Sequence, residues 1–363
     1  MRVFIKIGAL PLLRALLQSQ QAGLLLVILL LGAVLAAFAG SHVDPATGRL
    51  TNNFLNPNTL IQVATDASFF AIMAVGATMV IISGGIDLSV GSVFALSGVM
   101  MAMALRSAGP LSAAGALGLG LAVCLGLGLA CGLANGLMVV GLRVHPFIVT
   151  LGTMWVLRGI AFVASKAESI LVPDALTGVV KASLGLGQAL SPLPMVTMLV
   201  VAGVGSLFLG NTVLGRQVFA TGGNLEASRF AGLRLGRVLV TVYALSGLAA
   251  GVAAFLGSAY YGSASCADAT GYELYVIASA VVGGASLNGG KGSAGSAMLG
   301  AVLITLIRQS IRSLHLDQNY EWIIIGCAII AAVVMDQAGS RLAARRLAQR
   351  PPEETPAPVG AAG

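Results

Sequence analysis

The sequence contains few charged residues. Only 9% of its 363 residues are Asp, Glu, Lys or Arg, whereas 57% are hydrophobic. Ordinary soluble domains carry about 25% charged residues, so this chain has too few to cover the surface of a soluble fold of its size. The scarcity of charge excludes a soluble globular protein and indicates a protein embedded in a membrane.

Residues for metal, redox and hydrolytic chemistry are also scarce. The chain has four cysteines and three histidines, without a CxxC pair or a Cys/His spacing typical of a metal site. No Ser/His/Asp or Cys/His constellation occurs, so we expect no metal site and no enzyme activity in this chain. Residues 289–293 (GGKGS) resemble a phosphate-binding loop only superficially, because Ala285 and Gly292 break its pattern. We therefore expect no nucleotide cofactor in this chain.

Long apolar runs recur along the whole length. Windows of about 20 apolar residues have the length of a transmembrane helix, and the alternating segments of a β-barrel are absent. The sequence predicts an all-α polytopic membrane protein with about ten spans. We expect them at 22–40, 59–82, 88–105, 111–140, 146–165, 193–211, 237–257, 272–288, 294–314 and 319–336. Glycines interrupt 272–288, which makes it a candidate re-entrant segment.

The lysines and arginines predict the orientation. With the N-terminus inside, most of them fall in inside segments, so the positive-inside rule favours an even number of spans with both termini in the cytoplasm. We expect a cytoplasmic N-terminal segment over 1–21, a membrane domain over 22–336 and a disordered cytoplasmic tail over 337–363.

A glycine-rich polar step joins the second and third expected spans. Residues 83–92 read SGGIDLSVGS, and VGGASL at 282–287 echoes the first half of this step about 200 residues later. Polar groups at such a seam are costly unless they line a cavity, and broken segments at matching positions of two halves point to a transport site. The alternative is chance repetition of Gly-Gly in a glycine-rich chain. The predicted path residues are Gly84, Gly85, Asp87, Ser89, Gly91, Gly283 and Gly284.

The longest inside loop, 214–237, predicts a short amphipathic helix. Asn224 is a good N-cap, Glu226 suits the first turn, and Gly232 can end the helix. Ala227, Phe230 and Ala231 form an apolar strip, and Arg229 is one of four arginines nearby. We favour a docking element for a cytoplasmic partner over a plain linker helix.

The remaining ionisable residues and the spaced glycines within or near the spans are expected to have structural roles. Three carboxylates near outer ends are expected in the headgroup zone, and Arg158 is expected to extend outward. These carboxylates are Asp66, Glu273 and Glu321. Glycines at four-residue spacing predict close helix packing, namely Gly128, Gly132 and Gly136 in one span and Gly247 and Gly251 in another.

Four motifs carry a family resemblance. Residues 79–92 (MVIISGGIDLSVGS), 146–159 (PFIVTLGTMWVLRG), 215–232 (GRQVFATGGNLEASRFAG) and 271–295 (GYELYVIASAVVGGASLNGGKGSAG) occur in this order. Over roughly residues 60–336 the chain resembles the permease subunits of bacterial ABC importers for monosaccharides, the ribose/xylose/arabinose class.

The resemblance implies an inner-membrane permease that moves a monosaccharide or related polyol. It implies a tandem ATPase inside, which binds the ATP, a periplasmic binding protein outside and a second permease copy, identical or not. By resemblance, Asn224, Glu226, Ala227 and Gly232 belong to the segment that engages the ATPase. Two alternatives remain: the same machinery carrying a branched-chain amino acid, nucleoside or signalling furanose, or an ion-coupled carrier using Asp66, Asp87 and Glu273.

Overall fold

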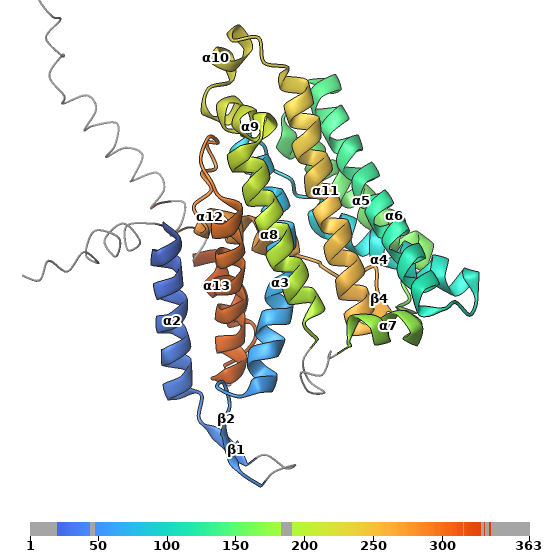
Figure 1. The fold of residues 1–363 in the computed structure, drawn as a ribbon, viewed down its shortest axis with the longest axis vertical. Coiled ribbons are helices and arrows are strands. Elements are labelled where there is room, and N and C mark those ends of the chain that lie inside the picture. Colours follow the sequence, from blue (N-terminus) through green and yellow to red (C-terminus); the bar gives the residue numbers. More distant parts are fainter. Residues whose placement is uncertain are drawn as a thin grey trace, which may run out of the picture.

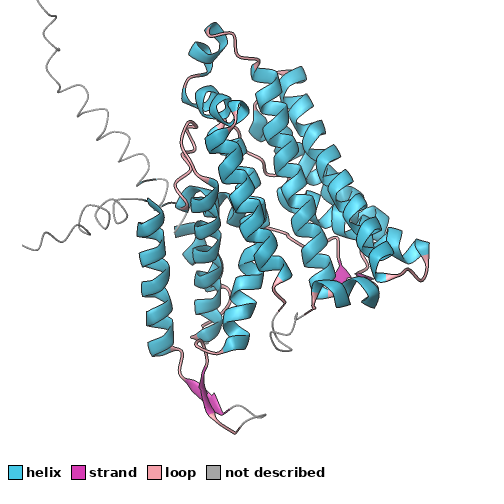
Figure 2. Ribbon diagram, viewed as in Figure 1, coloured by secondary structure: helices cyan, strands magenta, loops and turns pink. Residues whose placement is uncertain are grey.

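The computed structural model describes residues 20–43, 48–182, 191–314 and 316–327, together with Ile330 and Val334. This part of the chain is almost entirely helical, as Figure 2 shows, and holds two small two-stranded sheets. The predicted all-α class is confirmed. Most of the expected N-terminal segment and the whole expected tail lie outside the described residues.

Eight helices among the described residues are long and apolar enough to cross a membrane. Each lies at one of the predicted spans, because the sequence places its apolar runs there. They are α2 (Gln20–Phe38), α3 (Pro57–Ile82), α4 (Val90–Ala108), α5 (Ala113–Leu142), α6 (Pro146–Ser165), α8 (Leu193–Asn211), α11 (Leu235–Tyr261) and α13 (Ala294–Ser313).

The two remaining predicted spans differ from this group. Helix α12 covers only Tyr272–Val282, which is 11 residues. At 1.5 Å per residue it is about 16 Å long, roughly half of a hydrocarbon core, so it cannot cross a membrane by itself. Of the predicted span 319–336, the described part is helical over 320–327. The count of ten spans therefore stays a prediction.

Helix α3 forms the centre of the bundle (Figure 1), and Thr65 through Ile82 are all buried. It begins at Pro57, two residues before the predicted start, because Asn56 caps it and Pro57 occupies its first turn. The cap is a hydrogen bond of 2.8 Å from the Thr59 amide to the Asn56 side chain.

Helices α5 and α11 pack closely through their glycines, as predicted. A Cβ added at Gly136 would lie 2.7 Å from the Cα of Val240, and one added at Gly128 would overlap the carbonyl oxygen of Gly247. Real Cβ atoms do not approach backbone this closely, so these positions require glycine. The small residues let the two backbones approach each other.

The short elements gather at the two ends of the bundle (Figure 1). Helices α9 (Val213–Gly223) and α10 (Leu225–Phe230) lie at one end, called here the α10 end. The hairpin of β1 (Ser41–Val43) and β2 (Leu50–Asn52) lies at the opposite end, called here the β1 end. There, β3 (Ile170–Leu171) pairs antiparallel with β4 (Ser263–Ala264) beside α7 (Asp174–Val180).

Candidate functional site

The two glycine steps form the same local structure. Helix α3 ends with Gly84 donating to the Ile81 carbonyl at 2.9 Å and Gly85 donating to Val80 at 3.0 Å. Both bonds recur 200 residues later, at 2.8 and 2.9 Å, where α12 ends with Gly284 and Ala285 donating to Val281 and Ala280. Each step is a Schellman motif. The two glycine pairs of the sequence echo therefore end their helices in the same way.

Each motif depends on one glycine in the left-handed region. Gly84 has φ +86 and Gly284 has φ +88. This conformation is strained for any residue with a Cβ. Gly283 has an ordinary φ of −65, but a Cβ there would lie 2.8 Å from the Cα of Ala297 on α13, so close packing also requires glycine at this position.

The residues that flank the two steps meet each other and the end of α9. The amide of Gly290, in the loop after α12, donates to the carbonyl of Ile82 at 2.8 Å. Gly222, in the last turn of α9, packs against both groups, and a Cβ there would lie 2.7 Å from the Gly290 nitrogen. We call Ile82, Gly222 and Gly290 the glycine junction. It brings the predicted path segments together with the start of the predicted docking element.

Helix α10 forms where the sequence places the docking helix. The Asn224 side chain accepts from the Ala227 amide at 2.9 Å, and Gly232 follows the helix with φ +78. Every residue of α10 except Ser228 is exposed, and the Phe230 ring is 90% exposed. The apolar strip therefore has no partner within the described part of the chain.

Asp87 lies buried among α4, α5 and α11, with only 3% of it exposed. Its Oδ1 accepts from the Ser89 amide at 3.0 Å and the Ser89 hydroxyl at 2.7 Å. Its Oδ2 accepts from the Ser246 hydroxyl at 2.8 Å, and the Asn135 amide donates to Ser89 at 2.8 Å. The sequence placed Asp87 and Ser89 on a path, and the structure places them in a fully bonded interior network.

The backbone of the first step is also satisfied by side chains. The carbonyl of Ile86 accepts from the Tyr243 hydroxyl at 3.2 Å and from the Thr150 hydroxyl at 3.1 Å. Gly85 allows this arrangement, because a Cβ there would lie 2.7 Å from the Tyr243 oxygen. Exposed backbone is tolerated at membrane depth when the protein supplies partners.

Arg158 does not extend outward, so that expectation was wrong. Its Nη1 donates to the carbonyls of Cys266 and Asp268 at 2.7 and 2.6 Å, and its Nη2 donates to Ala269 at 3.4 Å. Three carbonyls in the loop before α12 accept hydrogen bonds from the guanidinium instead. Arg158 therefore holds residues 265–271, called here the inner loop, against α6.

Gly91 connects the first step to the inner loop. A Cβ at Gly91 would lie 2.6 Å from the Ala269 carbonyl oxygen and 2.7 Å from Oε2 of Glu273. The predicted path residue Gly91 thus lets α4 touch the inner loop and the start of α12. Glu273 Oε2 has no hydrogen-bond partner in the described part of the chain.

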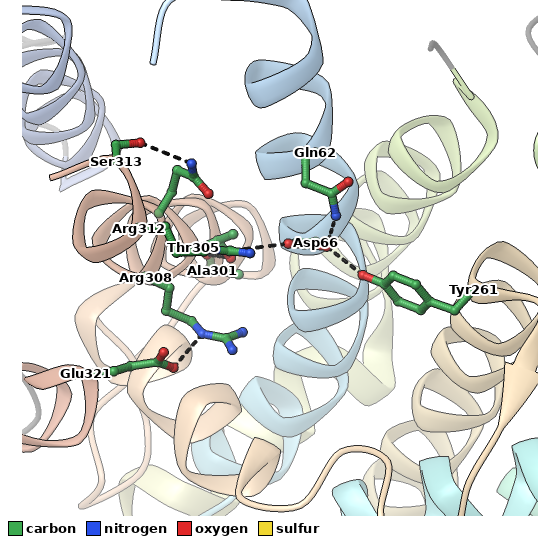
Figure 3. A network of polar contacts seen from close by, with 10 residues as sticks. Gln62, Asp66, Tyr261, Ala301, Thr305, Arg308, Arg312, Ser313 and Glu321 are labelled. Atoms are coloured by element: carbon green, nitrogen blue, oxygen red, sulfur yellow. Dashed lines mark hydrogen bonds and ion pairs between the residues drawn. The ribbon is translucent and has the colours of Figure 1, made fainter. Parts of the chain in front are cut away.

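Two of the carboxylates expected in the headgroup zone are paired with protein groups (Figure 3). Asp66 on α3 accepts from the Tyr261 hydroxyl at 2.7 Å and from Gln62 at 2.9 Å, and lies 3.5 Å from Arg312 on α13. Glu321 accepts from Arg308 at 2.6 Å. These contacts give both residues a structural role that the sequence did not reveal.

Within the described residues, no group of three or more His, Cys, Asp or Glu side chains could hold a metal ion. Sequence reasoning found the two steps and α10. It missed four residues that contact the first glycine step or its flanks, namely Gly222, Ser246, Asn135 and Tyr243. Nothing in an apolar or glycine-rich helix shows which of its residues will contact a segment far away in the sequence. The only available signal was polarity, since Asn135 and Ser246 are rare polar residues in apolar runs.

Comparison with known proteins agrees with these observations. The family model described as "Branched-chain amino acid transport system / permease component" matches residues 59–333. The ribose import permease protein of Escherichia coli (strain K12) is 34% identical over 292 residues, which cover 79% of this chain and 88% of that protein. The D-allose transport system permease protein of the same strain is 33% identical, with 79% and 86% covered.

A third relative is the autoinducer 2 import system permease protein of Yersinia enterocolitica, 30% identical, with 84% of this chain and 80% of that protein covered. The resemblance drawn from the four sequence motifs is confirmed. The chain therefore belongs to this family of multi-pass transport-system permease components.

Proposed function

We propose that this chain is the membrane-spanning subunit of an ATP-driven importer that receives a monosaccharide or related polyol from a periplasmic binding protein. The relatives named above are permeases for ribose, D-allose and autoinducer 2, which supports a neutral, hydroxylated solute. The subunit itself is not an enzyme in this proposal, because a separate tandem ATPase binds and hydrolyses the ATP.

The observation that carries the proposal is the continuity between α10 and the glycine junction. Helix α10 offers an unpartnered apolar strip, and the chain directly before it, Gly222, touches Ile82 and Gly290. A partner that moved α10 would thereby push on the ends of α3 and α12 together. Packed interfaces with discrete arrangements can convert such a small shift into a larger one.

The proposed orientation follows from this role. The α10 end faces the cytoplasm and the ATPase, both termini lie in the cytoplasm, and the β1 end faces the periplasm and the binding protein. Closure of the ATPase dimer on ATP moves Asn224, Glu226, Ala227, Arg229 and Gly232, and the motion reaches Gly84, Gly85, Asp87, Ser89, Gly91, Gly283 and Gly284. A second permease copy completes the pathway.

Reconstitution tests the proposal. The full chain is placed in liposomes alone, with its ATPase and binding protein, and with the same partners plus a non-hydrolysable ATP analogue. Uptake of radiolabelled D-ribose, D-allose and L-leucine is measured in each case. We expect sugar uptake only with both partners and hydrolysable ATP. Uptake by the chain alone, driven by a proton or sodium gradient, would instead establish the ion-coupled carrier.

A further inference from the structure

A small cavity of about 110 Å³ lies between α4, α11, the inner loop and α12, near the β1 end. Aromatic rings and oxygen-bearing side chains share its lining, which includes Phe94, Ser258, Tyr261, Ser263, Asp268 and Tyr272. We propose that this cavity is a transit site for a neutral sugar, an inference that rests on the proposed function.

Ser258 is the first reason for a ligand. Its side chain is buried, with 2% of the residue exposed, and its hydroxyl has no hydrogen-bond partner in the described part of the chain. A buried hydroxyl without a partner is costly. A sugar hydroxyl in the cavity would satisfy it.

Asp268 supplies the second polar group. Its Oδ2 accepts from the Ser265 amide at 2.8 Å, while no hydrogen bond to Oδ1 exists among the described residues. The inner loop holds this carboxylate in place, because Arg158 donates to the Asp268 carbonyl at 2.6 Å. A fixed carboxylate oxygen at a cavity wall is a strong acceptor for a sugar hydroxyl.

The aromatic rings supply the apolar wall. Phe94 and Tyr272 have centroids 6.2 Å apart and are inclined by 55°. The Tyr261 hydroxyl is already bonded to Asp66, so its ring is the part left to face a ligand. The faces of aromatic rings carry negative charge density, which attracts the weakly positive C–H groups of a sugar.

The same lining disfavours an amino acid. An amino-acid carboxylate would need a cation, and no Lys or Arg is among the described residues that line the cavity. A branched apolar side chain would leave the Ser258 hydroxyl unpaired. A polyol fits both the hydroxyl and the carboxylate. Such binding should be weak, because a transit site must also release its solute.

Saturation-transfer NMR on the full chain in nanodiscs tests this site, with D-ribose, D-allose and L-leucine as probes. We expect transfer to at least one sugar, exceeding that to leucine. Ser258→Ala and Asp268→Asn should each weaken sugar binding by about 3- to 10-fold, the effect of one hydrogen bond. Ser258→Ala should not lower stability, because it removes an unpaired group.

Two matched variants serve as controls. Ser165→Ala removes a buried hydroxyl that donates to its own helix, to Ala161 at 2.9 Å, and Asp317→Asn changes an exposed carboxylate. Both should bind sugar as the wild type does. The inference is overturned if neither sugar receives transfer, if leucine receives more, or if either site variant binds like the wild type. ATP-dependent sugar uptake that persists alongside any of these results would leave the proposed function intact.

Discussion

Gly222 packs directly against the backbone of Ile82, a residue 140 positions earlier in the chain, and leaves no room for a side chain between them. This contact joins the last turn of α9 to the end of α3, and the Gly290 amide joins the loop after α12 to the same carbonyl at 2.8 Å. Three segments that are far apart in the sequence therefore contact one another at a single place, directly before α10.

The first prediction concerns this junction. Gly222→Ala should separate α9 from α3, because its methyl group would overlap the Ile82 carbonyl. We expect it to lower ATP-dependent uptake at least tenfold while the protein still inserts and purifies. Gly223→Ala is the matched control, since a Cβ there has nothing within 4 Å. Equal uptake by both variants would show that the junction transmits no motion.

The second prediction concerns the Asp87 network. Asp87→Ala leaves the Ser89 amide and the hydroxyls of Ser89 and Ser246 without their acceptor inside the protein. We expect a loss of about 2–4 kcal/mol in the free energy of unfolding, measured by SDS titration in mixed micelles. Asp317→Asn, on the surface, should change it by less than about 0.5 kcal/mol. Wild-type stability of Asp87→Ala with lost uptake would instead assign Asp87 to the path.

The third prediction concerns the inner loop. Arg158→Lys keeps the charge but loses the planar fork that reaches the carbonyls of Cys266, Asp268 and Ala269. We expect faster hydrogen exchange across residues 265–271, measured by mass spectrometry. Arg106→Lys, at an exposed site in the last turn of α4, should leave this exchange unchanged. Unchanged exchange in both variants would show that Arg158 does not hold the loop.

The sequence predicts the helices well because few backbone structures are stable in the hydrocarbon core of a membrane. Where an apolar run is long enough, a helix must satisfy its own N–H and C=O groups. The end of α3 was also predicted, since the expected span 59–82 and the helix both end at Ile82. The expected span 272–288 instead runs six residues past Val282, the last residue of α12. Asn224 marked the start of α10 by local chemistry alone.

The partners of these segments were not predictable. Arg158 could reach headgroups or carbonyls, and only the fold of the inner loop brings three carbonyls to it. The sequence predicts Asp87 as a path residue, but it cannot show that Ser246, 159 residues away, donates a hydrogen bond to this carboxylate. Local signals locate helix ends and caps, whereas contacts between distant residues depend on packing that a single sequence does not record.

The fourth prediction concerns the two ion pairs in Figure 3. The Arg308–Glu321 pair is reinforced, because the Tyr275 hydroxyl donates to the same Glu321 oxygen at 2.7 Å and the guanidinium lies over the Tyr275 ring. A double-mutant cycle with Arg308→Met and Glu321→Gln should give a coupling of about 1–3 kcal/mol. The Arg312–Asp66 pair is longer and its arginine is more exposed, so it should couple by only about 0–1 kcal/mol. The reverse order would contradict this assignment.

The fifth prediction concerns docking at α10. Phe230 exposes nearly its whole ring in a helix of only six residues, so its side chain contributes little to the fold but much to a contact surface. Phe230→Ala should leave the melting temperature of the purified chain unchanged. It should weaken association with the ATPase by at least tenfold, because interface aromatics often contribute 2 kcal/mol or more, roughly a 30-fold change in affinity.

Phe38 provides the matched control for this test. It is also a highly exposed phenylalanine, but it ends α2 near the β1 hairpin, far from α10 (Figure 1). Phe38→Ala should bind the ATPase as the wild type does, measured by co-purification and by surface plasmon resonance in nanodiscs. If Phe230→Ala binds as tightly as Phe38→Ala, then α10 is a linker helix and the ATPase must contact another surface at that end.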